Sequence, residues 1–200
     1  MEWIFIISFA IVLASATGLR AFLPLTIVSI MAKLNLVTIP ASSHFIAFIT
    51  DDRVLIFLIC ATVIEILSDK IPVVDNFLDG VYSFVKPILS LISSFGIVFS
   101  KLEFWQAAII AITLSFVSTS TAMVTKGVVR LTSSATTGGT ANPFVSLIED
   151  ILVTIKVVLS IIFIWLLPIL AILVILTSSI LGFTIFKIGY RILKVEKTNT

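Results

Sequence analysis

Charged residues are scarce in this chain, and so are the side chains that most often bind metals. Of its 200 residues only 12% are Asp, Glu, Lys or Arg, and it has one cysteine, Cys60, and one histidine, His44. A single cysteine excludes an intramolecular disulfide, and neither residue has the companions that a zinc site needs. We expect Cys60 to be a small apolar residue within a helix and His44 to lie on a surface loop; the sequence names no metal or cofactor.

Hydrophobic residues dominate instead. They make up 59% of the sequence, and the mean hydropathy is +1.24, whereas soluble domains contain roughly 45–50% apolar residues. A domain of this size cannot bury so much apolar surface away from water. The composition therefore predicts an integral membrane protein whose main partner is the lipid bilayer. No nucleic-acid partner is expected, and a homo-oligomer is left open.

The first apolar segment has one feature of a secretory signal. Residues 4–13 are apolar, and Ala14-Ser15-Ala16 has the form of a signal-peptidase site. The start "MEW" has an acid and no basic residue, whereas a signal peptide begins with basic residues. We therefore expect a retained membrane helix, with cleavage as the minor alternative.

Proline and glycine divide the apolar sequence into predicted helices. Residues 3–32 are too long for one untilted span of ~20 residues, and Gly18 and Pro24 interrupt them. A broken or re-entrant helix pair is expected there. Residues 35–53 are predicted to be a loop with a short amphipathic piece. Further apolar segments lie at 54–68, 88–100, 104–124 and 143–188.

Two prolines are predicted to bracket a separate helix. Between Pro72 and Pro87 lies room for a helix of roughly four turns. The segment 88–100 that follows is too short to span a bilayer comfortably and is expected to be re-entrant. The last apolar segment is expected to be kinked or divided around Pro168.

The predicted fold is an all-α integral membrane protein, a helical bundle with broken or re-entrant helices. Residues 1–200 form a single multi-spanning domain with a basic tail at 191–200, which the positive-inside rule places in the cytoplasm, with the bundle in the cell membrane. The halves 1–100 and 101–190 share a weak pattern: a cation, then a proline break, then acids. This pattern is compatible with a two-fold inverted repeat. The pattern joins Arg20, Pro24, Glu65 and Asp69 in one half to Lys126, Arg130, Pro143, Glu149 and Asp150 in the other.

Charges inside or beside the apolar helices are nearly balanced. The cations are Arg20, Lys70, Lys86, Lys126 and Arg130, and the acids are Glu65, Asp69, Asp75, Asp79, Glu149 and Asp150. An unpaired charge at a helix centre costs ~2.5–3.5 kcal/mol, so these groups must be paired, line water or lie at the interface. Lysines reach the interface easily, which favours that position for Lys70, Lys86 and Lys126. For Asp75 and Asp79, an interfacial position and a functional role fit the sequence equally well.

A position at the membrane interface explains Arg20 less well than the other charges, because apolar sequence lies on both sides of it. A structural salt bridge to Glu65 or Glu149 is the simplest alternative to a functional role. Glu65 and Asp69 are four residues apart, so they share one helical face and repel. They need a nearby cation, a metal ion or a shared proton. A proton-coupled or cation-binding site follows, but so does plain pairing with Arg130.

The stretch "TTGGTANPFVSLIED" at 136–150 is predicted to stop one helix and start another. The Ser/Thr/Gly run 132–142 breaks the helix, with Gly138 and Gly139 permitting an unusual backbone. Asn142 is a favoured N-cap and Pro143 a favoured first helical residue. Such a helix start can bind an anion, although ordinary capping also explains it. Ser146, Glu149 and Asp150 follow, and both acids are expected to face Arg130 or Arg20 across the bundle.

These motifs together resemble a bacterial membrane-protein family known as domain of unknown function 4126. The segments that carry the resemblance are "GLRAFLP" (18–24), "DKIPVVD" (69–75) followed by Asp79, "KP" (86–87), "KGVVR" (126–130) and "TGGTANPFVSLIED" (137–150). It covers roughly residues 15–170 and implies a multi-spanning membrane protein, with no activity to transfer. Many members have Asn in place of Arg20 and a His shortly before the K-x-x-x-R pair. Here Thr119, Ser120 and Thr121 occupy that region, which argues against a histidine proton relay.

Three functions remain open from the sequence. The first is a small transporter or channel, with a substrate at the Ser/Thr/Gly loop and the helix start at 143. The second is a scaffold in which buried ion pairs join helices, supported by the small residues "ASATG" at 14–18. The third is a lipid head-group enzyme with Mg²⁺ at Asp75 and Asp79, although no nucleophile motif accompanies that pair.

Overall fold

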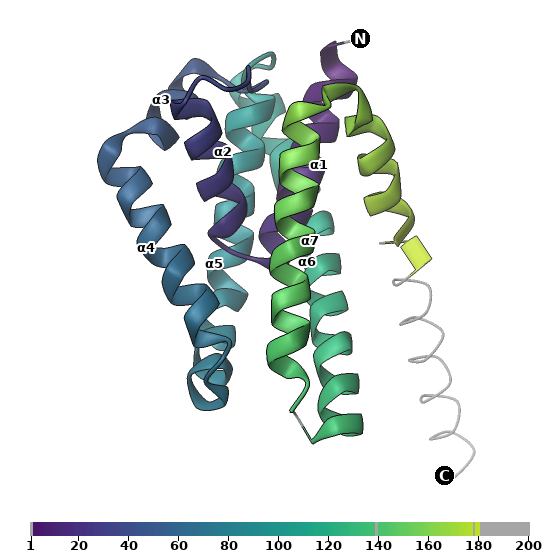
Figure 1. Ribbon diagram of the computed structural model, residues 1–200. Helices are drawn as coiled ribbons and strands as arrows, with labels where there is room; N and C mark the ends of the chain where they lie inside the picture. Colours follow the sequence, from purple (N-terminus) through teal and green to yellow (C-terminus); the bar gives the residue numbers. More distant parts are fainter. Residues whose placement is uncertain (1, 139, 178, 181–200) are drawn as a thin grey trace, which may run out of the picture.

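The chain is a bundle of helices (Figure 1). The computed structural model describes residues 2–138, 140–177 and 179–180, apart from the side chains at 72, 73, 75–77 and 79. Within this part the chain is all-helical. The helices are α1 (Glu2–Leu19), α2 (Leu23–Lys33), α3 (Ser43–Thr50), α4 (Asp52–Ser68), α5 (Pro72–Val98), α6 (Phe104–Thr137) and α7 (Asn142–Ile162), and a short 3-10 turn, η1 (Ile164–Leu166), begins the segment Ile164–Thr177.

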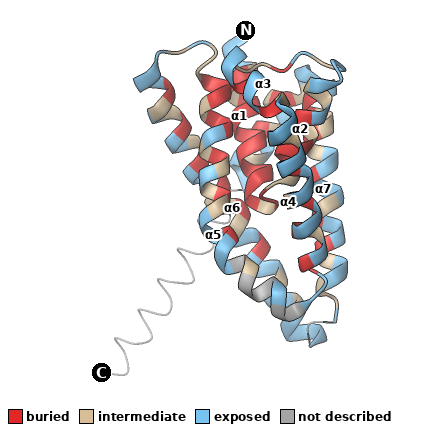
Figure 2. Cartoon of the chain, turned by 90° about the vertical axis from the view of Figure 1, so that its left-hand side faces the viewer, coloured by how far each residue is buried: buried red, intermediate tan, exposed pale blue. Residues whose placement is uncertain are grey.

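α1 occupies the centre of the bundle. It packs against α5, α6 and α7, and its buried residues form a large part of the core (Figure 2). From the end of the bundle that holds the N-terminus, α1 runs inward and α2 returns toward the same end, where α3 lies (Figure 1). The pair therefore forms a hairpin whose turn, at residues 20–22, lies inside the bundle.

Three described helices are long and apolar enough to cross a membrane: α1, Gly80–Val98 of α5, and α6. A fourth candidate is α7 with Ile164–Thr177, a pair bent by 112°. Large hydrophobic side chains such as Phe116, Leu131 and Phe144 are exposed on the outside. A bilayer would cover such surface, so the fold indicates a membrane protein.

The predicted break in the first apolar block is present, but Gly18 has another role there. The helix ends after Leu19, and Pro24 lies in the first turn of α2, since a proline ring is incompatible with the helical position of the carbonyl four residues before it. Gly18 is still helical and packs on α6: an added Cβ would lie 2.7 Å from the Cβ of Ala122 and 2.8 Å from the carbonyl oxygen of Thr119. It allows close packing of α1 on α6 and does not itself break the helix.

Two predicted boundaries around α5 are wrong. α5 continues through Pro87 to Val98, so there is neither a separate helix ending at Pro87 nor a short re-entrant segment at 88–100. Neighbouring helices can offset the lost backbone hydrogen bond of a proline within a membrane bundle. α1, α3 and α6 all pack against α5, and this packing favours one continuous helix.

The Ser/Thr/Gly run 132–142 ends α6, as predicted, but only at its glycine and not at its first Ser/Thr residues. Thr132, Thr136 and Thr137 are helical, and their hydroxyls donate to carbonyls of the preceding turn. The helix ends only at Gly138, whose φ of 62° is left-handed and favours glycine. Gly139, also predicted as a helix break, lies outside the described residues.

Two further expectations need correction. α7 begins at Asn142 with Pro143 in its first turn, but Asn142 is not the N-cap; its amide nitrogen donates to Ser134 Oγ at 3.0 Å. The last apolar segment, by contrast, is divided near Pro168 as expected: the break lies at Phe163, because the proline ring disfavours the helical turn that precedes it. His44 is exposed as expected, but it lies within α3 and not in a loop.

Candidate functional site

Arg20 is fully buried at the turn between α1 and α2 and is surrounded by acids. It forms an ion pair with Asp69, its Nε lies 2.7 Å from Asp150 Oδ1, and its Nη2 lies 3.9 Å from Glu149 Oε2. Nη2 also donates to the carbonyl and the hydroxyl of Ser146, at 2.9 and 2.7 Å. The expected salt bridge to Glu149 is thus present at long range, and the expected pairing of Asp150 with Arg20 is confirmed.

Asp69 joins three parts of the chain. It follows the last residue of α4 and pairs with Arg20 from the α1–α2 turn. Its Oδ2 also lies 3.0 Å from Arg130 Nη2 of α6 and accepts a hydrogen bond of 3.0 Å from Ser146 Oγ of α7. This carboxylate therefore connects the turn to both later helices.

Glu65 binds backbone, not a cation. Its two carboxylate oxygens accept hydrogen bonds from the N–H groups of Ala21 and Phe22, at 2.7 and 3.0 Å. These N–H groups precede α2, where the helix dipole favours a negative charge. The pairing of Glu65 with Arg20 that the sequence suggested is replaced by this cap, which satisfies donors that would be costly to leave unpaired in a membrane.

Lys86 caps the other side of the same turn. Its Nζ donates to the carbonyl oxygen of Leu19, the last residue of α1, at 3.1 Å. The side chain is buried within the bundle, as is that of Lys126, so neither lysine extends to the protein surface as the sequence analysis favoured, whereas Lys70 is exposed. A cation at a helix C-terminus is favourable, and here it stabilises a C-terminus inside the bundle.

Glu149 is held more loosely than Asp69. Its Oε2 lies 3.7 Å from Lys126 Nζ, 3.9 Å from Arg20 Nη2 and 4.0 Å from Arg130 Nη2. Within the described part of the chain this oxygen is buried and accepts no hydrogen bond. Glu149 Oε2 is thus attracted by three cations without a short contact to any of them.

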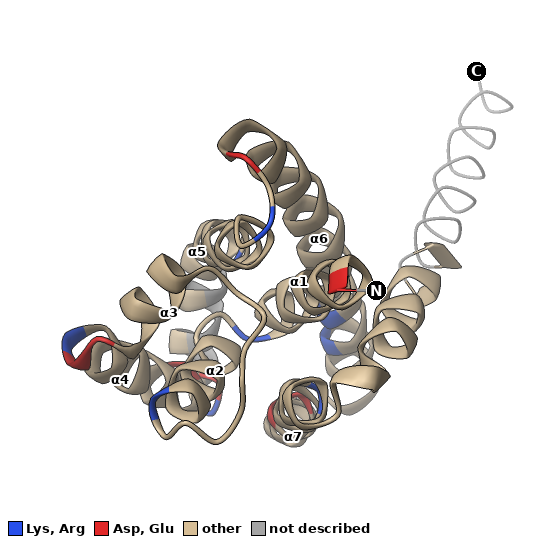
Figure 3. Ribbon diagram, turned by 90° about the horizontal axis from the view of Figure 1, so that it is seen from above, with Lys and Arg blue, Asp and Glu red and all other residues tan. Residues whose placement is uncertain are grey.

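The charged cluster is the name we give to the side chains that meet at this turn. It consists of Arg20, Glu65, Asp69, Lys86, Lys126, Arg130, Ser146, Glu149 and Asp150. Seen down the bundle, acidic and basic positions lie between α1, α2 and α7 as well as at the helix ends (Figure 3). Residues from the turn, α4, α5, α6 and α7 contribute, so the cluster exists only in the folded bundle.

A pocket of about 180 Å³ adjoins the charged cluster between α5 and α6. Three cations of the cluster, Lys86, Lys126 and Arg130, line it together with Ser83, Met123 and Gly127. The pocket gives the cluster a recess next to its cations, while Arg20 itself has no exposed surface.

Most of the sequence-predicted site residues meet in the cluster, and a few do not. Asn142 bonds to Ser134, and the side chains of Asp75 and Asp79 lie outside the described residues. Among the described residues no three of His, Cys, Asp and Glu are grouped as a metal site would need.

The sequence reasoning does not locate three lysines correctly. Lys86 and Lys126 are expected at the surface, but both are buried. Lys156 is not among the predicted site residues, yet it is the only charged residue in the apolar run 151–162. A count of isolated charges within each apolar run would have found it.

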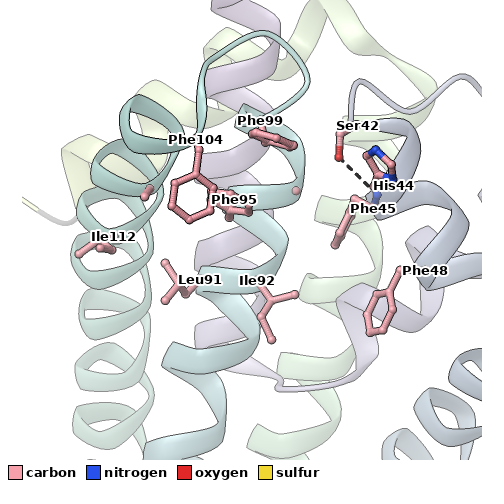
Figure 4. Close-up of a pocket in the computed structure, with 12 residues that line it drawn as sticks. Ser42, His44, Phe45, Phe48, Leu91, Ile92, Phe95, Phe99, Phe104 and Ile112 are labelled. Carbon is pink, nitrogen blue, oxygen red and sulfur yellow. Dashed lines mark hydrogen bonds between the residues drawn. The ribbon is translucent and has the colours of Figure 1, made fainter.

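A larger pocket elsewhere in the bundle has a different character. It measures about 520 Å³ and lies where α3, α5 and α6 meet, lined mainly by aromatic and aliphatic side chains such as Phe48, Phe95 and Phe104 (Figure 4). Its polar residues are Ser42 and His44, and the Ser42 hydroxyl accepts from the N–H of Phe45. This pocket lacks the charged groups that could bind a polar solute, so the charged cluster is the better candidate site.

Comparison with known proteins identifies one family for the chain. The sequence model of the family described as "Domain of unknown function (DUF4126)" matches residues 7–186. No curated protein and no solved structure matches the chain.

Proposed function

The chain belongs to the family described as domain of unknown function (DUF4126), and we propose that it is a small membrane transporter or channel. Its solute is an ion or a small polar or anionic molecule, and its site is the charged cluster. One observation carries this proposal: two helix ends meet inside the bundle, capped by Glu65 and Lys86, beside a pocket lined by three cations. Broken helices that bring their termini to a polar site are a recurring design in transporters.

The pocket between α5 and α6 supplies the attraction for a solute. Lys86, Lys126 and Arg130 favour an anionic group there, and Arg130 offers the planar donors that match a carboxylate or phosphate. Asp75 and Asp79, at the start of α5, remain in the proposed site. Asn142, at the start of α7, belongs to it as well, and the solute passes these three residues.

Glu149 is the proposed coupling residue. The sequence favoured Glu65 and Asp69 for this role, but Glu65 accepts two backbone hydrogen bonds and Asp69 contacts three partners. Glu149 lies 3.7–4.0 Å from three cations. A proton or a cation on Glu149 would weaken its attraction for Lys126 and Arg130, and those cations would then be available to an anionic solute.

We propose the following setting for this site. The chain is one multi-spanning domain in the cytoplasmic membrane, with residues 191–200 in the cytoplasm. Its halves, 1–100 and 101–190, form an inverted repeat in which each half supplies a proline-started helix, α2 or α7, to the charged cluster. The proposal covers a homo-oligomer of this chain as well as a single copy.

A structural scaffold is the second candidate. It is favoured by the burial of Arg20, whose side chain has no exposed surface and pairs with acids from two elements. In that case the charges only join helices, and the pocket holds water. The enzyme hypothesis rests on Asp75 and Asp79, whose side chains lie outside the described residues.

A flux assay in proteoliposomes separates the two candidates. A panel of chloride, acetate, phosphate and glutamate, each with and without a proton or sodium gradient, is tested with the wild type and with Arg130→Gln. The variant should lower the flux of the accepted solute by about tenfold or more, because a hydrogen bond to a charged group contributes about 1.5–3 kcal/mol. The control is Arg53→Gln, an exposed arginine at the start of α4. If no solute moves faster than through empty liposomes, or if folded Arg130→Gln behaves as wild type, the transport proposal fails.

A further inference from the structure

Lys156 is a second polar centre of the bundle, separate from the charged cluster. It lies in the middle of α7 and its Nζ donates to Ser15 Oγ of α1. No ion pair joins it to an acid in the part of the chain that the structure describes. It follows Glu149 by seven residues, which places it on the same face of α7 about 10 Å farther along the helix.

Lys156 opens onto a pocket of its own. This pocket measures about 180 Å³ and is bounded by α1, α6, α7 and the segment Ile164–Thr177. Its polar lining consists of the ammonium group and five hydroxyls, from Ser15, Ser118, Thr121, Thr125 and Thr177; the rest is Leu19, Ala122 and Val174. Neither an acid nor a second cation is among these residues.

An ammonium group in such a place needs a counter-charge. Lys156 is only partly buried in the bundle, but it lies within an apolar helix, where a charge is costly and one hydroxyl neighbour does not offset it. The charged cluster solves this problem with its own acids, whereas the lining of the Lys156 pocket holds none. A negative ligand beside Lys156 would supply the missing charge.

The lining also indicates the size and charge of the ligand. A single cation matches a monovalent anion, and the pocket volume corresponds to about six water molecules of ~30 Å³ each. No guanidinium is present to bind a phosphate in the bidentate manner. Thr121 and Thr125 now donate to carbonyls of α6, but hydroxyls can rotate to donate to a ligand.

We propose that Lys156 and the surrounding hydroxyls bind a small monovalent anion, a halide or a short carboxylate. This site is distinct from the charged cluster and its pocket between α5 and α6. The proposal does not depend on transport, since an anion bound here stabilises the bundle whether or not it moves.

Chloride binding to the purified full chain tests this directly. The protein in non-ionic detergent is exchanged into sodium gluconate, chloride is added, and the ³⁵Cl line width is followed with acetate as a competitor. Lys156→Met should weaken chloride binding, measured by the saturable broadening, by about tenfold or more, because one charged hydrogen bond is lost. Lys156→Arg should retain it, and Thr121→Val should weaken it less. Two controls should bind like wild type: Lys101→Met, an exposed lysine paired with Glu2, and Arg130→Gln in the other pocket.

Thermal unfolding provides a second readout. Chloride should raise the Tm of the wild type relative to gluconate and leave that of Lys156→Met unchanged. In gluconate alone, the variant should be at least as stable as the wild type, because an uncompensated charge has been removed. Absence of saturable chloride or acetate binding to the wild type overturns the proposal. Equal broadening or equal stabilisation in Lys156→Met overturns it as well, and loss of binding in Arg130→Gln alone would assign the anion to the other pocket.

Discussion

Glu65 and Lys86 lie on opposite sides of the turn between α1 and α2 and cap the two helix ends that meet there. Glu65 accepts from the N–H groups of Ala21 and Phe22, and Lys86 donates to the carbonyl oxygen of Leu19. Each side chain has the charge that its helix end favours. The irregular backbone can therefore lie within the bundle, which is otherwise costly in a membrane.

This relationship predicts a graded loss of stability. Glu65→Ala leaves two N–H groups without their acceptor and should lower the free energy of unfolding by about 2–6 kcal/mol, since each unsatisfied group costs about 1–3 kcal/mol. Glu65→Gln keeps an acceptor oxygen and should lose less. Unfolding by SDS or heat, followed by circular dichroism, measures both. The control is Glu103→Ala, an exposed acid at the start of α6 whose side chain makes no cap; equal losses at both positions would contradict the capping role.

The pair of Arg20 and Asp69 predicts strong coupling. Removing one partner of a buried ion pair leaves a charge uncompensated, so Arg20→Met and Asp69→Asn should each destabilise the protein by about 3–5 kcal/mol. The double variant should lose clearly less than the sum, since it leaves fewer unmatched charges. A double-mutant cycle on unfolding free energies measures this. Simple additivity would mean that the two side chains act independently, and the exposed pair of Lys33 and Asp52 serves as the matched cycle.

Close packing of α1 on α6 predicts that Gly18 tolerates no side chain. A Cβ there would lie 2.7 Å from that of Ala122, so Gly18→Ala should destabilise the protein by about 1–3 kcal/mol through overpacking. At Gly80 nothing lies within 4 Å of an added Cβ, and Gly80→Ala in α5 should be neutral or stabilising by up to about 1 kcal/mol. Thermal unfolding of the two variants compares them directly. A destabilised Gly80→Ala beside an unchanged Gly18→Ala would contradict the packing.

The sequence predicted the elements better than their ends. Composition and long apolar runs predicted the helical bundle, and the break before Pro24 followed from proline chemistry. The same rule failed at Pro87, because tertiary packing on α5 outweighs the lost hydrogen bond. The predicted break in the run 132–142 comes only at Gly138, because the hydroxyls of Thr132, Thr136 and Thr137 bond back to their own helix. Local pattern alone does not contain these contacts.

The charged cluster was predictable as a set but not in its pairings. Charge balance required partners for Arg20, Asp69 and Glu149, and the structure brings them together. Which acid meets which cation depends on the depth of the α1–α2 turn, which the sequence does not specify. Glu65 illustrates this, since its partners are backbone N–H groups. Lys156 could have been found only by counting charges in every apolar run.

Membrane crossing predicts opposite exposure of two positions. His44 in α3 and Thr136 near the end of α6 are both exposed, and Figure 1 places α3 and the end of α6 at opposite ends of the bundle. In a Cys60→Ala background, single cysteines at 44 and 136 should therefore face opposite sides of the bilayer. A membrane-impermeant maleimide added outside right-side-out vesicles should label one of them, and inverted vesicles should reverse the result. Labelling of both from one side in sealed vesicles would mean that α6 does not cross the membrane, and the transport proposal would lose its physical basis.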